Sequence, residues 1–201
     1  ILSGLVGSEM CIRDRYTARE LEHQLKDSGA TAIVILENFA STLEQVIEKT
    51  PVKHVVITAM GDLLGGLYGS WITLAVRHLK KMVPPFKLPL SDGRTVTPFS
   101  QALGEGRGRT LAADKSTLDS IAFLQYTGGT TGLSKGAVLT HRNIVAATLQ
   151  AEAWFTPALA RAGDLAKVNS IAALPLYHIF ALTLCLLCLL YTSDAADEGL
   201  G

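Results

Sequence analysis

A glycine- and threonine-rich run in the middle of the chain combines the residue types that bind phosphate. It extends from Tyr126 to Gly136 and reads YTGGTTGLSKG. Glycines permit positive φ and close approach of backbone N–H groups, and consecutive N–H groups form a nest for phosphate oxygens. Hydroxyls can donate to phosphate or ligate Mg²⁺, and a lysine adds a point charge. The expected ligand is a polyphosphate, held by Tyr126, Thr127, Gly128, Gly129, Thr130, Thr131, Gly132, Ser134, Lys135 and Gly136.

The position of Lys135 distinguishes this run from a Walker loop. A Walker loop has Gly-Lys followed by Ser or Thr and opens directly into a helix. Here Ser134 precedes the lysine, and strands are predicted on both sides, at 120–126 and 136–139. Such a setting lacks the helix N-terminus that binds phosphate in Walker proteins, so the loop itself must supply the donors. The purely structural alternative is a hairpin with glycine-rich turn chemistry.

The first half of the chain alternates helix and strand patterns. Thr17-Ala18-Arg19-Glu20 is a capping box that predicts a helix ending near Gly29. The apolar, β-branched runs at 31–36 and 53–58 predict buried strands, with a helix over 39–49 between them. Continuous apolar strands separated by helices indicate an α/β fold with a mostly parallel sheet and helices on both faces.

The rest of the chain has weaker local signals. Amphipathic spacing predicts a helix over 71–82, Ser91-Asp92-Gly93 predicts a turn, and three glycines make 103–115 a surface loop. Further elements are predicted after the glycine-rich run: a helix over 141–154, a strand over 170–174 and an apolar helix over 179–190.

Composition excludes several classes of protein. Hydrophobic residues make up 48% of the 201 residues, which is enough to bury the core of one sizeable domain. Lys plus Arg and Asp plus Glu are 18 each, so no basic excess indicates nucleic-acid binding. The three cysteines form no disulfide framework, which favours a reducing compartment.

The two ends of the chain differ in character from the rest. Residues 1–15 follow neither helix nor strand periodicity, and 191–201 turn abruptly small and acidic. We expect both ends to be non-native sequence, such as translated adapter; the alternative is ordinary frayed termini. Residues 16–190 are then the part that folds as a domain.

Three segments together resemble the adenylate-forming superfamily of acyl- and aryl-CoA synthetases, luciferases and peptide-synthetase adenylation domains. They are the glycine-rich run, VLTHRNI at 138–144 and LPLYHIF at 174–180. Over about 16–190, YTARELEHQLKDSGA, KHVVITAMGDLLG and VRHLKKMVPPFKLP further resemble the bacterial long-chain fatty-acid–CoA ligase branch.

The resemblance implies a partial N-terminal domain of layered αβαβα architecture and a two-step reaction. A fatty carboxylate attacks the α-phosphate of Mg·ATP, and coenzyme A then displaces AMP from the acyl-adenylate. By the same resemblance Thr127 contacts Mg²⁺, Lys135 pairs with the outer phosphates, and His178 lines the passage between the nucleotide and acyl sites. A histidine beside an apolar run can also be a packed core residue.

The resemblance and the sequence bear on partners and location. The resemblance implies ATP, Mg²⁺, coenzyme A and a fatty acid as ligands and a homodimer of the parent protein. From the residues themselves we expect no nucleic-acid partner, and a cytoplasmic protein that is peripheral on the inner face of the cell membrane. The adenine-binding motifs and the C-terminal domain of the family do not follow Leu190, so we expect this chain alone to be inactive.

Several alternatives stay open from the sequence. The parent protein could be a medium-chain or aryl-CoA ligase, or a non-catalytic nucleotide-binding module. The apolar run at 179–190 is short for a membrane span, and Cys185-x-x-Cys188 lacks the second pair of a metal site. The cations Arg77, Lys80, Lys81 and Lys87 beside apolar residues suit an anionic lipid surface or a solvated helix face.

Overall fold

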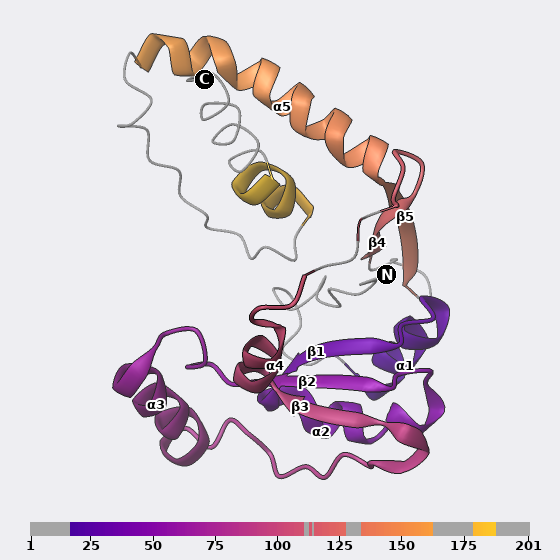
Figure 1. The fold of residues 1–201 in the computed structure, drawn as a ribbon, viewed down its shortest axis with the longest axis vertical. Coiled ribbons are helices and arrows are strands. Elements are labelled where there is room, and N and C mark those ends of the chain that lie inside the picture. The colour runs from indigo at the N-terminus through magenta and orange to yellow at the C-terminus, as the bar shows by residue number, and fades with distance from the viewer. Residues whose placement is uncertain (1–16, 111–112, 114, 128–133, 163–178, 188–201) are drawn as a thin grey trace. The chain divides into compact units, whose positions relative to one another are not determined.

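The computed structural model describes residues 17–110, 113, 115–127, 134–162 and 179–187 (Figure 1). The chain divides into two compact units. Among the described residues, 17–110, 113 and 134–136 belong to the first unit, and 115–127, 137–162 and 179–187 to the second. Each unit is described by itself below.

The first helix forms as the capping box predicts. Helix α1 spans Ala18–Asp27, and the Glu20 backbone N–H donates to the Thr17 hydroxyl at 3.3 Å. The Glu20 carboxylate accepts in return from the Thr17 backbone N–H at 3.0 Å. After the C-cap Ser28, Gly29 takes a φ of 63°, which ends the helix in a conformation that glycine adopts without strain.

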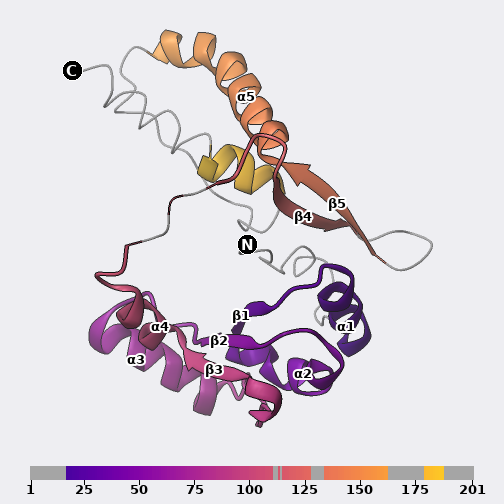
Figure 2. The same ribbon diagram turned by 45° about the vertical axis from the view of Figure 1, so that its right-hand side comes forward.

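The sheet of the first unit is parallel, which confirms the predicted α/β class. Its strands are β1 (Ala32–Leu36), β2 (His54–Thr58) and β3 (Thr95–Pro98), in the order β1-β2-β3. The register places Ile33 opposite Val55, and Val55 opposite Val96. The three strands lie side by side in both views of the ribbon (Figure 1, Figure 2). The apolar runs predicted as strands at 31–36 and 53–58 are therefore confirmed.

The core of this unit lies where α1 and the segment after β1 pack with the sheet. The largest side chains with no more than 1% exposure come from α1, from the segment between β1 and β2, and from β2: Leu25, Leu43, Ile47, Val52 and Val55. Burial of such side chains is the main favourable term in folding, at roughly 1.5–3 kcal/mol for each Leu, Ile or Val.

The helix predicted over 39–49 is wrong as one continuous element. The structure has a 3₁₀ turn at Glu37–Phe39, the short helix α2 (Ala40–Glu44) and a second 3₁₀ turn at Ile47–Lys49. The break falls at Val46, whose φ of −128° is outside the helical range. Val46 and Ile47 are β-branched, and such side chains lose rotamer freedom in a helix. Both side chains are buried in the core, and this burial stabilises the interrupted helical conformation.

Two further predictions in the first unit need correction. The helix predicted from residue 71 begins earlier, as α3 (Gly66–Leu74), and continues as a π-helical turn over Ala75–Leu79. The segment 103–115 is only partly a loop, because α4 (Phe99–Gly106) extends into it. The turn at Ser91–Gly93 is confirmed, with positive φ at Asp92 and Gly93.

The described residues of the second unit include strand β4 (Ile121–Thr127), most of strand β5 (Lys135–Thr140) and a long helix. Strands β4 and β5 are hydrogen-bonded neighbours, and α5 (His141–Ala162) follows β5 directly (Figure 2). The helix is longer than the predicted 141–154 and continues through Pro157. A helical turn at Ala181–Leu187 matches part of the apolar helix predicted over 179–190. The strand predicted over 170–174 lies outside the described residues.

Candidate functional site

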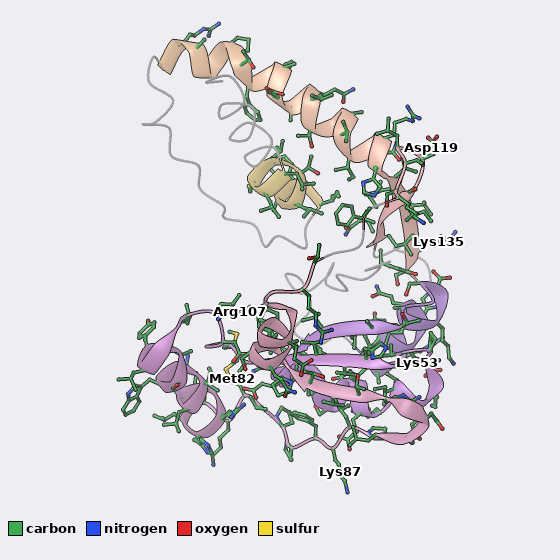
Figure 3. All side chains as sticks on the ribbon, in the orientation of Figure 1. Lys53, Met82, Lys87, Arg107, Asp119 and Lys135 are labelled. Carbon is green, nitrogen blue, oxygen red and sulfur yellow. The ribbon has the colours of Figure 1, made fainter. Side chains whose placement is uncertain are left out.

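The glycine-rich run joins two paired strands, as the sequence predicts. Strand β4 carries Tyr126 and Thr127 at its end, and β5 begins at Lys135. The Tyr126 side chain is buried, whereas Lys135 is exposed at the start of its strand and labelled there in Figure 3. No helix begins at the lysine, which confirms the distinction from a Walker loop.

Strand β5 is tied to the helix that follows it. The Thr140 hydroxyl donates to Asn143 Oδ1 at 2.9 Å and accepts from the Asn143 backbone N–H at 3.3 Å. The Thr140 backbone N–H donates to the same Asn143 oxygen at 3.0 Å. These reciprocal bonds satisfy donors at the N-terminus of α5 and fix the direction in which the chain leaves β5.

The start of α5 is also bound to the residues before β4. The His141 backbone N–H donates to the Ser120 carbonyl at 3.0 Å, and the Arg142 N–H to the Leu118 carbonyl at 2.8 Å. The Arg142 guanidinium contacts the Asp119 carboxylate at 2.9 Å. The ion pair is exposed and contributes little by itself, but the backbone bonds fix β4 and β5 at their shared end.

A histidine far away in the sequence contacts the loop just before its lysine. His23 Nε2, on α1, lies 2.9 Å from the carbonyl oxygen of Ser134. A carbonyl only accepts hydrogen bonds, so Nε2 carries the proton in this contact. The bond is part-buried and joins residues 111 positions apart. It holds the backbone beside Lys135 against α1, within the first unit.

We expect His23→Ala to reduce the adenylate formation implied by the sequence resemblance about three- to tenfold in the intact parent protein, because a displaced Ser134 backbone misplaces Lys135. His23→Gln retains an N–H donor and is expected to recover most of the activity. Initial rates of ATP–pyrophosphate exchange against ATP concentration measure both variants. Equal rates for wild type, Ala and Gln would show that the contact does not position the loop.

The described residues cover the candidate site only in part. Ser134, Lys135 and Gly136 are described, and Tyr126 and the backbone of Thr127 belong to β4. The other predicted phosphate ligands, Gly128, Gly129, Thr130, Thr131 and Gly132, and the predicted catalytic His178 lie outside the described residues. The proposed roles of all these residues therefore stay predictions.

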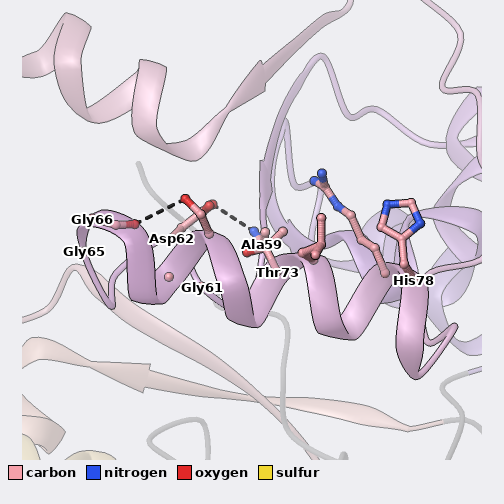
Figure 4. A pocket seen from close by; sticks show the side chains of 11 residues that line it. Ala59, Gly61, Asp62, Gly65, Gly66, Thr73 and His78 are labelled. Atoms are coloured by element: carbon pink, nitrogen blue, oxygen red, sulfur yellow. Dashed lines mark hydrogen bonds between the residues drawn. The ribbon is translucent and has the colours of Figure 1, made fainter.

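The first unit also contains a cavity that the sequence did not indicate. It has a volume of about 410 Å³ and lies between the loop after β2 and helix α3 (Figure 4). Asp62 and His78 lie toward opposite ends of its lining. Asp62 accepts hydrogen bonds from the Ala59 backbone N–H at 2.8 Å and from the Thr58 hydroxyl at 3.1 Å. Its carboxylate therefore stabilises the turn after β2.

Two glycines allow this loop and α3 to approach closely. A Cβ built at Gly69 would lie 2.3 Å from the Gly61 carbonyl oxygen, and a Cβ at Gly61 would lie 1.9 Å from the Gly69 carbonyl oxygen. Real Cβ atoms do not approach backbone oxygens so closely, so both positions require glycine. Gly61 and Gly69 therefore serve the packing of this loop against α3.

We expect Gly69→Ala to destabilise the first unit by about 1–3 kcal/mol, because the new methyl overlaps a backbone oxygen that can move only with its loop. Gly104→Ala is the matched control: it lies in α4, with no atom within 4 Å of its built Cβ. The control is expected to be neutral or to stabilise by about 0.5–1 kcal/mol. Urea unfolding followed by circular dichroism compares the two, and equal midpoints would contradict the close approach.

The described residues contain neither a metal-binding cluster nor a membrane-spanning helix. No three His, Cys, Asp or Glu side chains among them gather so as to hold a metal ion. No helix in the described ranges is both long and apolar enough to cross a membrane. Cys185 is a free, half-buried thiol, and Cys188 lies outside those ranges.

Both the family model and similar curated relatives assign the chain to the same class of enzyme. The family model described as AMP-binding enzyme matches residues 9–193. The chain is 49% identical over 173 residues to proteins named long-chain-fatty-acid–CoA ligase from Salmonella typhimurium and Escherichia coli O157:H7, with 86% of this chain and 29% of each relative covered. The relative of the same name from Haemophilus influenzae is also 49% identical, over 174 residues, covering 86% of this chain and 30% of that protein.

The chain thus spans less than a third of the length of these curated relatives. The matched residues include the whole run from Tyr126 to Gly136 and both strands that flank it. The resemblance stated from sequence motifs is confirmed at the level of the family: the chain belongs to the AMP-binding enzymes.

Proposed function

We propose that the chain is part of a ligase that activates a long-chain fatty acid as an acyl-adenylate and transfers the acyl group to coenzyme A. The observation that carries the proposal is the strand–loop–strand unit with Lys135 exposed where β5 begins. The names of relatives at 49% identity support the same substrate class. Products are acyl-CoA, AMP and pyrophosphate.

The loop's contribution to the reaction follows from charge. The carboxylate attacks the α-phosphate, the bond to the β-phosphate breaks, and pyrophosphate leaves with added negative charge. Backbone N–H groups, hydroxyls and the Lys135 ammonium aimed at the outer phosphates stabilise this charge as it develops. His23, through the Ser134 carbonyl, acts as a positioning residue for that ammonium.

The donors of the loop fit a polyphosphate with its metal ion. Mg²⁺ bound with nucleotides takes few protein ligands and neutralises phosphate charge. Thr127 at the end of β4 is the residue of this chain proposed to contact it, and a carboxylate from the remainder of the parent protein would complete the site. His178 is proposed to line the passage to the acyl site, where its ring would exclude water and orient the carboxylate.

Further proposals concern the parent protein. We propose that it is a cytoplasmic homodimer that touches the inner face of the cell membrane peripherally. We also propose that the 201-residue chain alone makes no acyl-CoA, because it spans only 29–30% of the length of the relatives that are named for this activity. Acyl-CoA production by the purified chain, free of contaminating ligase, would contradict this.

The experiment that tests the function uses the intact parent enzyme. Palmitate, octanoate and benzoate are compared in assays of AMP and acyl-CoA formation with ATP, Mg²⁺ and coenzyme A. The proposal expects equal amounts of AMP and acyl-CoA, with the highest kcat/KM for palmitate. A preference for octanoate or benzoate would favour another adenylate-forming ligase, and ATP binding without AMP formation would favour a non-catalytic nucleotide-binding module.

A further inference from the structure

A long segment of the first unit carries positive charge and no negative charge. Between Leu63 and Leu90 there is no Asp or Glu, although the whole chain contains 18 acidic residues. The same segment, here called the basic–apolar segment, contains a histidine and four cations: Arg77, Lys80, Lys81 and Lys87. It includes α3, the π-helical turn and the proline-rich stretch before β3.

The apolar side chains of this segment are exposed to an unusual degree. Of the residues in α3, only Gly69 is buried. Leu67 is 82% exposed and Trp71 68% exposed, and with Leu74 they follow the i, i+4, i+7 spacing of one helix face. Further large apolar side chains exposed in the segment are Leu63, Leu64, Tyr68, Leu79, Met82 and Leu90. A group of large apolar side chains that are exposed close together marks an interaction surface.

The C-terminal end of the helical part is anchored to the 3₁₀ turn at Glu37–Phe39, directly after β1. Arg77 donates to both carboxylate oxygens of Glu37, at distances of 2.7–3.1 Å, and the Glu37 side chain is only 4% exposed. Hydrogen bonding to Glu37 raises the pKa of Arg77, so the guanidinium stays charged. The Asn38 amide donates to the Met82 carbonyl at 3.1 Å. The segment is therefore held in place while its apolar side chains stay exposed.

The positive charges of this segment that are not paired with a carboxylate are those of its lysines. Arg77 is neutralised by Glu37, but Lys80, Lys81 and Lys87 form no ion pair with any residue in the described ranges. All three are exposed, and Lys87 extends away from the fold (Figure 3). Unpaired lysines beside exposed Trp, Tyr and Leu side chains are the combination that binds the interface of an anionic bilayer.

We propose that the basic–apolar segment docks the protein on an anionic lipid surface. Trp71, Leu67 and neighbouring apolar side chains enter the interface, and Lys80, Lys81 and Lys87 contact lipid phosphates. Charge decides against a second copy of the chain as the occupant, because two such segments would bring like charges together. The inference rests on the peripheral membrane contact proposed above and assigns it a surface.

Vesicle binding tests the proposal on the 201-residue chain and on the intact parent enzyme. The chain contains two tryptophans, so Trp154→Phe leaves Trp71 as the single fluorescent reporter. Titration with phosphatidylglycerol vesicles is expected to shift Trp71 emission to the blue, and phosphatidylcholine vesicles are expected to bind at least tenfold more weakly. Added salt weakens the phosphatidylglycerol binding, because it screens exposed charges.

Charge reversal supplies the decisive variants. Lys80→Glu with Lys87→Glu is expected to weaken binding to phosphatidylglycerol at least tenfold, since each lysine near an anionic surface contributes about fivefold. Arg107→Glu with Arg109→Glu is the matched control, because it makes the same charge change at exposed sites outside the segment and should leave binding unchanged. Circular dichroism checks that both variants keep the wild-type fold.

Three results would overturn the proposal. They are equal binding to neutral and anionic vesicles, equal losses in the two double variants, and binding by the chain that the intact enzyme lacks. The last would show that other residues of the parent protein cover this face. Vesicle binding is measured without ATP or fatty acid, so its failure and the failure of ligase activity are distinguishable.

Discussion

Replacing Lys135 by alanine in the intact parent enzyme is expected to lower fatty-acid-dependent ATP–pyrophosphate exchange about 10²- to 10³-fold. Removing one donor aimed at developing charge costs roughly 2.7–4 kcal/mol in other enzymes, and pyrophosphate gains charge as it leaves. The loss should appear mainly in kcat, because the interaction strengthens in the transition state. Lys135 is exposed at the start of β5, so its removal should leave stability unchanged.

The control for this variant is Lys115→Ala. Lys115 is also exposed, precedes β4 and lies outside the glycine-rich run. Its removal makes the same change in net charge and is expected to leave exchange within twofold of wild type. Equal activities of the Lys135 and Lys115 variants would remove Lys135 from the phosphate site.

Leu25→Ala is expected to destabilise the first unit by about 2–5 kcal/mol. Leu25 is fully buried on α1, which contacts α2, and its truncation leaves a cavity. For a domain of ordinary stability this is a large fraction of the total free energy of unfolding. Urea titration of the 201-residue chain, followed by circular dichroism, measures the change in midpoint.

Leu67→Ala is the matched control for that truncation. It removes the same atoms from a side chain that is 82% exposed on α3, and the expected change is within about 0.5 kcal/mol. A loss at Leu67 equal to that at Leu25 would mean that α3 packs against a surface in solution. It would also contradict the exposed face on which the lipid-docking proposal depends.

The parts of the fold that the sequence predicted are those with strong local causes. The start of helix α1 could be predicted because the Thr17–Glu20 capping box lies within four consecutive residues. Strands β1 and β2 depend on short β-branched runs. Strand β3 was missed because TVTP is short and ends in proline, and only pairing with β2 makes it a strand. The continuous helix over 39–49 was wrong because burial of Val46 and Ile47 overrides the helical pattern.

In the candidate site, too, features with a local cause could be predicted and features that depend on distant residues could not. The strand–loop–strand arrangement around the glycine-rich run could be predicted, since both strands and the loop are adjacent in sequence. The contact between His23 and Ser134 could not, because 111 positions separate the two residues and neither has a local motif for it. The cavity beside α3 is lined in part by Gly61 and Gly69, and glycine content alone does not reveal the close approach of these two residues.

Isotope transfer tests the central proposal most directly. The intact parent enzyme is supplied with palmitate that carries ¹⁸O in both carboxylate positions, with ATP, Mg²⁺ and coenzyme A. Attack of the carboxylate on the α-phosphate places one ¹⁸O between carbon and phosphorus, and the thiol then breaks the carbon–oxygen bond. Adenylate formation predicts AMP with one ¹⁸O per acyl-CoA formed and unlabelled pyrophosphate. Label in inorganic phosphate or pyrophosphate, with none in AMP, would contradict adenylate formation.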